Sequence, residues 1–165
     1  MSAAHERTFR VFAVSRRPLL RRTAFLLCGD WHQADDLVQT ALVKLYVAWP
    51  RIRATESPDG YAHRTLVRCY LDERRRPWRR ESPSDLLDHD AVTTRATDEL
   101  LDLRAALARL PKRQRATLLL RFWVDASVAE TAAALGVTEG TVKSQAARAL
   151  DTLRARLVDV PAMEE

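Results

Sequence analysis

The sequence predicts an all-α protein of two small helical domains joined by a flexible acidic linker, with a helix-turn-helix in the second domain. Apolar residues recur every three or four positions along most of the 165 residues, which is the spacing of amphipathic helices. This periodicity stops in a stretch that contains Ser82-Pro83-Ser84 and several aspartates. Near the C-terminus, a glycine separates two short helical patterns. We therefore predict domains at residues 1–80 and 98–165, with the linker at 81–97.

The amino-acid composition limits the possible functions of the protein and its possible cellular compartments. The apolar share of 47% is sufficient for packed cores, and the net charge of +5 favours a polyanionic partner. Cys28 and Cys69 both lie in apolar helical patterns, which predicts buried reduced thiols rather than a disulfide framework. Arginines interrupt the N-terminal apolar residues, and no stretch has the length of a membrane span. We therefore expect a cytoplasmic protein without a membrane span.

The first domain begins with two long helical patterns. The first runs from Thr8 to Cys28, and Pro18 is expected to split or kink it. The second runs from Trp31 to Trp49, with Asp30 able to cap its start and Pro50 expected to end it.

A third helix is predicted from Ser57-Pro58 to about Asp72, since serine suits the N-cap and proline the first helical position. The basic run Glu73–Arg80 follows and contains Trp78. Its arginines could bind a nucleic-acid backbone while the indole stacks on an unpaired base. A cationic helix end that complements its own dipole explains the run equally well.

The second domain is predicted to begin with a helix after Thr97-Asp98 that Pro111 terminates, followed by another from about Lys112 to Trp123. Ser127 and Glu130 then form a capping box for a short Ala-rich helix, which ends at Gly136. Thr138 can cap the next helix. Small, turn and anchor residues at Ala132, Gly136 and Val142 have the spacing of a helix-turn-helix.

The last helix has two distinct faces. Its inward residues are Val142, Ala146, Ala149 and Leu153. Its outward residues and their flanks are Gly140, Thr141, Lys143, Ser144, Ala147 and Arg148. Short polar and cationic groups without an acid suit the major groove of DNA, where base edges and phosphates are approached closely. An ordinary helical hairpin with a solvated basic face is the alternative interpretation.

Both halves together resemble an extracytoplasmic-function (ECF) RNA polymerase sigma factor of the sigma-E-like subgroup. The segments that carry the resemblance are ADDLVQTALVKLY (Ala34 to Tyr46), YLDERRR (Tyr70 to Arg76), LPKRQRATLLLRFW (Leu110 to Trp123) and GVTEGTVKSQ (Gly136 to Gln145). The resemblance implies a transcription initiation factor whose first domain binds core polymerase and opens the −10 promoter element. The second domain would bind the −35 element as duplex.

The resemblance also implies three sets of site residues. The polymerase-binding set is Asp35, Asp36, Leu37, Val38 and Gln39, where paired acids beside exposed aliphatics would suit a basic helix of the β′ clamp. The −10 set is Arg68, Arg74, Arg75, Arg76 and Trp78, next to a loop expected over residues 51–60. The −35 set is Arg121, for a phosphate, with Gly140, Thr141, Lys143, Ser144, Ala147 and Arg148.

The chain departs from the family pattern at three positions. The sequence contains no Asn, and Arg68 stands where the strand-opening helix often carries one. Ala147 replaces a larger aromatic or His, and Gln145 replaces a frequent Arg. The base preference therefore stays open. The implied partners are promoter DNA and core RNA polymerase, through its β′ clamp and β flap, and the resemblance leaves room for an anti-sigma factor.

Two other classes of function compete with this reading. An enzyme is disfavoured because Asp35 and Asp36 point about 100° apart on a helix, and the four histidines have no metal-ligand spacing. We expect no catalytic residue, metal or cofactor. A conventional helix-turn-helix regulator would share the second domain, so the first domain must separate the two readings. Whether the domains close on each other in the free protein stays open.

Overall fold

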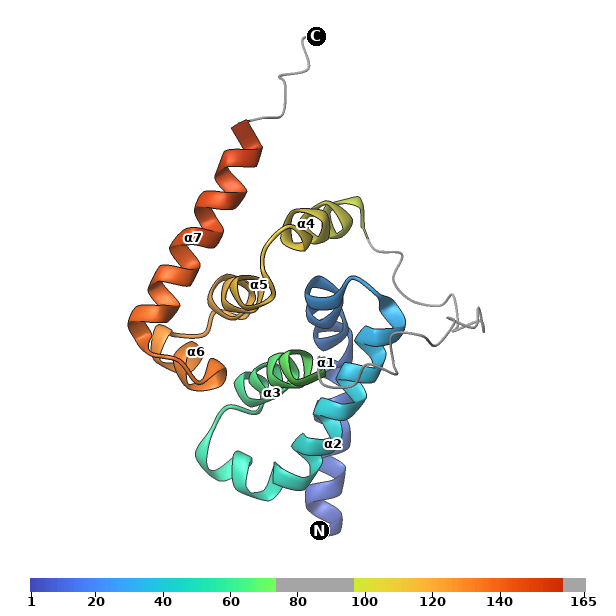
Figure 1. The fold of residues 1–165 in the computed structure, drawn as a ribbon. Coiled ribbons are helices and arrows are strands. Elements are labelled where there is room, and N and C mark those ends of the chain that lie inside the picture. The colour runs from blue at the N-terminus through green and yellow to red at the C-terminus, as the bar shows by residue number, and fades with distance from the viewer. Residues whose placement is uncertain (74–96, 159–165) are drawn as a thin grey trace.

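The computed structural model describes residues 1–73 and 97–158, and this part of the chain contains helices and no strand, as the sequence predicts. The first half consists of α1 (Ala3–Cys28), α2 (Trp31–Thr55) and α3 (Pro58–Asp72), which pack against one another. The second half consists of α4 (Asp98–Ala108), α5 (Lys112–Leu118), the π-helical turn η3 (Leu119–Trp123), α6 (Val128–Leu135) and α7 (Glu139–Val158). Figure 1 shows α7 as a long arm at one side of the molecule. The predicted linker, apart from Thr97, lies outside the described residues.

Proline does not end the helices of the first half. α1 is continuous through Pro18, and α2 continues past Pro50 for a further turn, so the prediction that Pro50 ends this helix is wrong. Trp49 and Ile52 on either side of Pro50 are 2% and 0% exposed. Because both side chains pack into the core, burial offsets the cost of a proline inside a helix. The loop expected over residues 51–60 is consequently only a short break at Glu56 and Ser57.

The predicted helix caps of both halves are confirmed. The amide of Gln33 donates to the Asp30 carboxylate at 2.9 Å. Ser57 is the N-cap of α3, with proline in the first turn but no bond from the serine hydroxyl. Ser127 and Glu130 form both bonds of the capping box, at 3.0 and 2.9 Å. Local sequence therefore determines where these helices begin.

The connection into the helix-turn-helix has an unusual backbone. The predicted helix from Lys112 to Trp123 changes at Leu119 into a π-helical turn, in which the amide of Val124 donates to the Leu119 carbonyl at 2.9 Å. Asp125 follows with a left-handed φ of 61°, a conformation that non-glycine residues adopt rarely. The turn leads directly into the capping box of α6.

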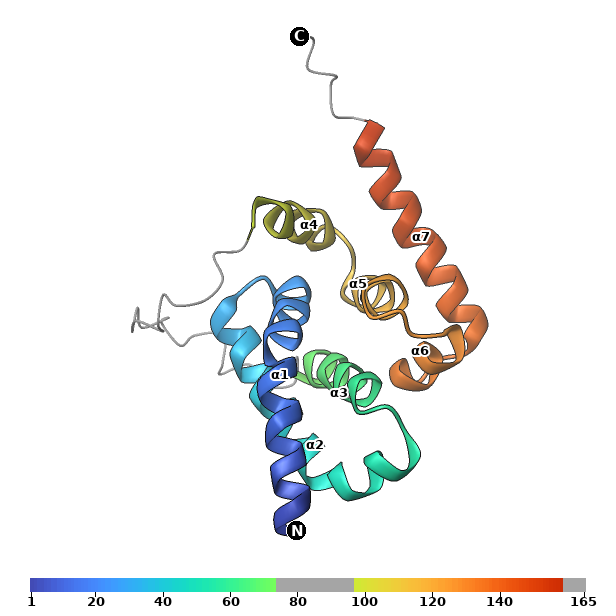
Figure 2. The same cartoon turned by 180° about the vertical axis from the view of Figure 1, so that it is seen from behind.

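The two halves are closed on each other and share one hydrophobic core. α4 and α5 lie against α1, and α6 lies against α3, as the opposite views of Figures 1 and 2 both show. Buried residues from α1 through α7 form a single continuous cluster. The structure thus answers the question that the sequence leaves open about the domain arrangement.

A buried arginine joins the halves. Arg115 is 9% exposed, and its guanidinium donates to the backbone carbonyls of Leu107 and Leu110 in its own half, at 2.8 and 2.9 Å. It also donates to the Leu27 carbonyl at 2.7 Å and to the Tyr70 hydroxyl at 2.8 Å in the first half. These bonds satisfy a desolvated cation, whose burial would otherwise be costly.

Candidate nucleic-acid interface

The faces of α7 lie as the sequence predicts. Val142 and Ala149 are 0% exposed and Ala146 is 9% exposed, so this side packs into the second half. The exposed residues of the opposite face are Gly140, Lys143, Ser144, Ala147 and Arg148. The exposed set has cationic and small polar groups and no acid. Such a face can approach the floor of a major groove while its cations meet phosphates.

The start of α7 is held by two threonines. The Thr141 amide donates to the Thr138 hydroxyl at 3.1 Å, and the two hydroxyls lie 2.9 Å apart. Thr141 is half-buried. Its hydroxyl is therefore engaged in orienting the helix, whereas the predicted contact residues beyond it stay exposed.

Gln145 faces the interior of the second half. Its side-chain oxygen lies 2.9 Å from the Thr117 hydroxyl of α5, within hydrogen-bonding distance. This bond attaches the reading helix to the helix beneath it. The residue that departs from the family pattern thus has a positioning role that the sequence did not reveal.

Arg121 lies on the π-helical turn and not on α7. The side chain is half-buried, and its Nη1 donates to the Ala126 carbonyl at 2.5 Å. The guanidinium carbon lies 5.7 Å from the centre of the Phe122 ring. These contacts hold the arginine close to the turn that precedes the capping box.

The predicted −10 residues are described only in part. Arg74, Arg75, Arg76 and Trp78 lie outside the described residues. Arg68 lies on α3 and is exposed, but its guanidinium is engaged with the second half. Its Nε donates to the Ala134 carbonyl and its Nη2 to the Ala133 carbonyl, both at 3.0 Å.

The predicted polymerase face on α2 is narrower than expected. Asp36 and Gln39 are exposed. Asp35 is half-buried and forms an ion pair with Arg21 at 2.6 Å. Leu37 and Val38 are 3% and 1% exposed, so the prediction of exposed aliphatics at these two positions is wrong: they belong to the packed stripe of the helix.

Other apolar side chains are exposed on the same helix. Val43 and Val47 are 64% and 77% exposed. They follow Asp36 and Gln39 at intervals of three or four residues, which places them along one face of a helix. We call Asp36, Gln39, Val43 and Val47 the outer face of α2. A helical wheel centred on Asp36 would have found the two valines from sequence.

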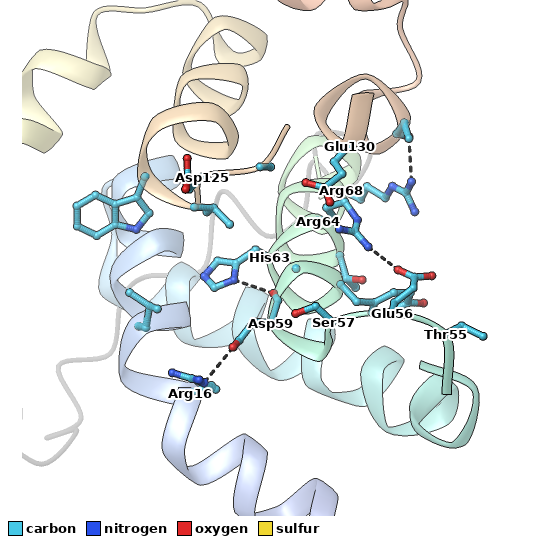
Figure 3. Close-up of a pocket in the computed structure, with 18 residues that line it drawn as sticks. Arg16, Thr55, Glu56, Ser57, Asp59, His63, Arg64, Arg68, Asp125 and Glu130 are labelled. Carbon is cyan, nitrogen blue, oxygen red and sulfur yellow. Dashed lines mark hydrogen bonds and ion pairs between the residues drawn. The ribbon is translucent and has the colours of Figure 1, made fainter. Parts of the chain in front are cut away.

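A cleft of about 820 Å³ opens between α1, α3, η3 and α6 (Figure 3). Two ion pairs lie along it, Arg16 with Asp59 at 3.0 Å and Arg64 with Glu56 at 2.5 Å. His63 is 4% exposed, and its Nδ1 lies 2.9 Å from the Asp59 carbonyl. Since a carbonyl only accepts, Nδ1 carries the proton of the neutral ring. Burial lowers the pKa of His63 from 6.5.

A metal centre is not visible in this part of the chain. Across residues 1–73 and 97–158, no three His, Cys, Asp or Glu side chains gather closely enough to hold a metal ion. Over the same ranges, none of the helices combines the length and apolar character needed to cross a membrane.

Comparison with known proteins identifies the family. The model of sigma-70 region 2 matches residues 13–80, and that of sigma-70 region 4 matches residues 100–153. The RNA polymerase sigma-E factor of Streptomyces coelicolor is 37% identical over 153 residues, which cover 91% of this chain and 86% of the relative. The chain belongs to the ECF family of RNA polymerase sigma factors. Membership favours a sigma factor over the conventional helix-turn-helix regulator.

Further relatives extend over most of this sigma factor. The ECF sigma factor SigM of Mycobacterium tuberculosis is 34% identical, across 84% of this chain and 69% of the relative. Among solved structures, the sigma factor RpoE of Bartonella quintana, in complex with the anti-sigma factor NepR, has a TM-score of 0.73 and 25% identity. That alignment covers 93% of this chain and 98% of RpoE. CnrH, in complex with the cytosolic domain of CnrY, shares the fold with a TM-score of 0.65.

Proposed function

We propose that this sigma factor binds core RNA polymerase in the cytoplasm and directs the enzyme to promoters, without catalytic activity of its own. The outer face of α2 would bind the β′ clamp, since its acid and amide suit a basic partner while the valines supply apolar contact area. The second domain would bind the β flap. The domains would be residues 1–80 and 98–165, with residues 81–97 between them.

Promoter recognition would be divided between the two halves. α7 would read the −35 element through Gly140, Thr141, Lys143, Ser144, Ala147 and Arg148, with Arg121 on a phosphate. Arg68 and the run containing Arg74, Arg75, Arg76 and Trp78 would bind the opened −10 element. Aromatic and cationic side chains suit unpaired bases and their backbone. An anti-sigma factor is a further proposed partner.

The observation that carries this proposal is the two-sided character of α7. One side is anchored by fully buried Val142 and Ala149, so the orientation of the other side is fixed. The fixed outer side presents Arg148 and Lys143 to solvent. A rigid helix face that offers cations, with no acid among Gly140, Lys143, Ser144, Ala147 and Arg148, is complementary to the major groove.

Replacement of two arginines tests the proposal. Arg148→Ala should relax the preference at one base pair of the −35 element, at a cost of about 1–3 kcal/mol. Arg121→Ala should weaken binding to all −35 sequences alike. It should also reduce the slope of log binding constant against log salt concentration by about one. The measurement is holoenzyme binding to a library of −35 variants at several salt concentrations.

Arg154→Ala serves as the matched control, because Arg154 is an exposed arginine farther along α7. We expect little change in base preference from it. A uniform loss for Arg148→Ala together with a changed base preference for Arg121→Ala would reverse the two assignments. If neither matters, α7 is not the −35 reader.

A further inference from the structure

Arg68 of the first half caps the C-terminal end of α6 in the second half. The amides of Gly136 and Val137 both turn back to the Ala132 carbonyl, which leaves the later carbonyls of α6 to other donors. Arg68 supplies them, with bonds of 3.0 Å to Ala133 and Ala134, and Figure 3 shows its side chain reaching from α3 toward α6. A cation at this end also complements the helix dipole.

Three other polar contacts join the halves, and each includes a buried side chain, that of Arg115, Tyr70 or Thr23. Arg115 is buried and also holds carbonyls of its own half. Lys112 donates to the Tyr70 carbonyl at 3.1 Å and lies 4.2 Å from the centre of that ring. The Trp123 indole donates to the fully buried Thr23 hydroxyl at 3.0 Å. Arg68 is exposed, and its bonds across the halves go to backbone carbonyls, so its guanidinium can exchange partners without leaving a buried side chain unpaired.

In the closed arrangement, the two proposed DNA-binding surfaces lie too close together to reach both promoter elements at once. Elements at −35 and −10 are about 25 base pairs apart, which is on the order of 85 Å along B-DNA. In the closed protein, α6 lies directly against α3, and α7 follows α6 after a short turn. The two DNA-binding surfaces must therefore separate before both elements can be bound.

We propose that Arg68 is a latch that holds the free protein closed, and that DNA at the −10 surface competes with the end of α6 for the same guanidinium. This inference rests on the proposed −10 role of Arg68. The guanidinium cannot donate to the Ala133 and Ala134 carbonyls and, at the same time, direct those same N–H groups to a base or phosphate. Closure and strand binding thus exclude each other at this residue.

Cys28 offers a natural reporter of opening. It ends α1 next to Gly29, where an added Cβ would lie 2.6 Å from Nε of Arg104 on α4. The second half therefore covers this end of α1, and burial raises the pKa of Cys28 to about 11. When the halves separate, α4 moves away, and the half-buried thiol of Cys28 becomes more accessible. Its reaction rate with a disulfide reagent then follows the open fraction.

The experiment compares this rate at pH 8 in the free full-length chain, with Cys28 and Cys69 resolved by peptide mass spectrometry. Arg68→Asn should speed modification of Cys28 about tenfold, because loss of two charge-assisted bonds shifts the open fraction by about that factor. Arg64→Asn is the matched control: it removes an arginine one turn earlier on α3, whose partner Glu56 belongs to the same half. It should change the rate less than about twofold.

The latch is overturned if Cys28 in Arg68→Asn is modified at a rate within about twofold of the rate in the unsubstituted chain. Cys69 is buried inside the first half and should stay slow. If both thiols accelerate together, small-angle X-ray scattering of Arg68→Asn decides. Two compact bodies farther apart support the latch, and an unchanged profile overturns it.

A short single-stranded DNA of mixed sequence tests the competition. It should accelerate Cys28 in the unsubstituted chain and have little further effect in Arg68→Asn. If Arg68→Asn opens the chain but the oligonucleotide does not, the latch stands and the proposed −10 role of Arg68 is wrong. The two proposals can therefore fail separately.

Discussion

Two glycines of the helix-turn-helix should respond in opposite directions to the addition of one methyl group. Gly136 ends α6 with φ of 65°, and a Cβ placed there would meet nothing within 4 Å. Gly136→Ala therefore adds backbone strain of about 1–2 kcal/mol without a steric clash. A less flexible unfolded chain offsets part of this cost. Gly140 lies within α7, and its Cβ would be 3.9 Å from the Thr138 hydroxyl. Gly140→Ala should stabilise the helix by up to about 0.5 kcal/mol, less than in a helix interior, because Gly140 lies in the first turn of α7.

Thermal unfolding followed by circular dichroism measures both effects. For a chain of this size, about 1 kcal/mol corresponds to a shift in Tm of about 2–4 °C, so Gly136→Ala should melt lower and Gly140→Ala higher than the unsubstituted protein. Gly140→Ala should nevertheless weaken −35 binding, since its methyl group stands on the face turned toward the groove. A stabilised Gly136→Ala variant would refute the left-handed turn. Tighter DNA binding by Gly140→Ala would refute the orientation of α7.

Two further predictions concern the first half. Burial lowers the pKa of His63 below its ordinary 6.5. As the pH falls, the imidazole therefore takes up a proton in the unfolded chain before it does so in the folded protein. The contribution of His63 to stability is thus present above about pH 6.5 and is lost as the pH falls toward the folded-state pKa. Urea unfolding at pH 7.5 and 5.5 measures the free energy of unfolding, which should fall less between these pH values in His63→Gln than in the unsubstituted chain. An equal fall in the two proteins would contradict this prediction. Replacing Val43 and Val47 together by serine should weaken binding to core polymerase about tenfold and leave Tm nearly unchanged, because both are exposed. The equally exposed Val11 and Val14 of α1 are the control, and a similar loss from their replacement would contradict a specific role for α2.

Much of the fold follows from patterns that are local in sequence. The capping box at Ser127, the left-handed end at Gly136 and the two faces of α7 depend on residues within a few positions of one another. Such patterns specify helix boundaries and the direction in which side chains project. The outward residues of the reading helix were therefore predictable from sequence.

Features that depend on tertiary packing were not predictable in this way. The local sequence around Pro50 predicts the end of a helix, but α2 continues beyond it because Ile52 packs into the core. Arg68 reads as a free cation, yet its partners lie 65 and 66 positions away in the sequence. Nothing near Arg115 in the chain indicates bonds to Leu27 and Tyr70. These contacts arise because the two halves close on each other.

The most direct test of the proposed function is to mix the purified chain with core RNA polymerase, and to measure complex formation and promoter-dependent transcription. The unsubstituted chain should form a stable complex and start transcripts at a defined site that core enzyme alone ignores. Asp36→Arg combined with Gln39→Ala should abolish both, while circular dichroism stays helical, because both side chains are exposed on the outer face of α2. Normal core affinity in this double variant would remove the role assigned to α2. Failure of the unsubstituted chain to bind core polymerase would contradict the proposed function itself.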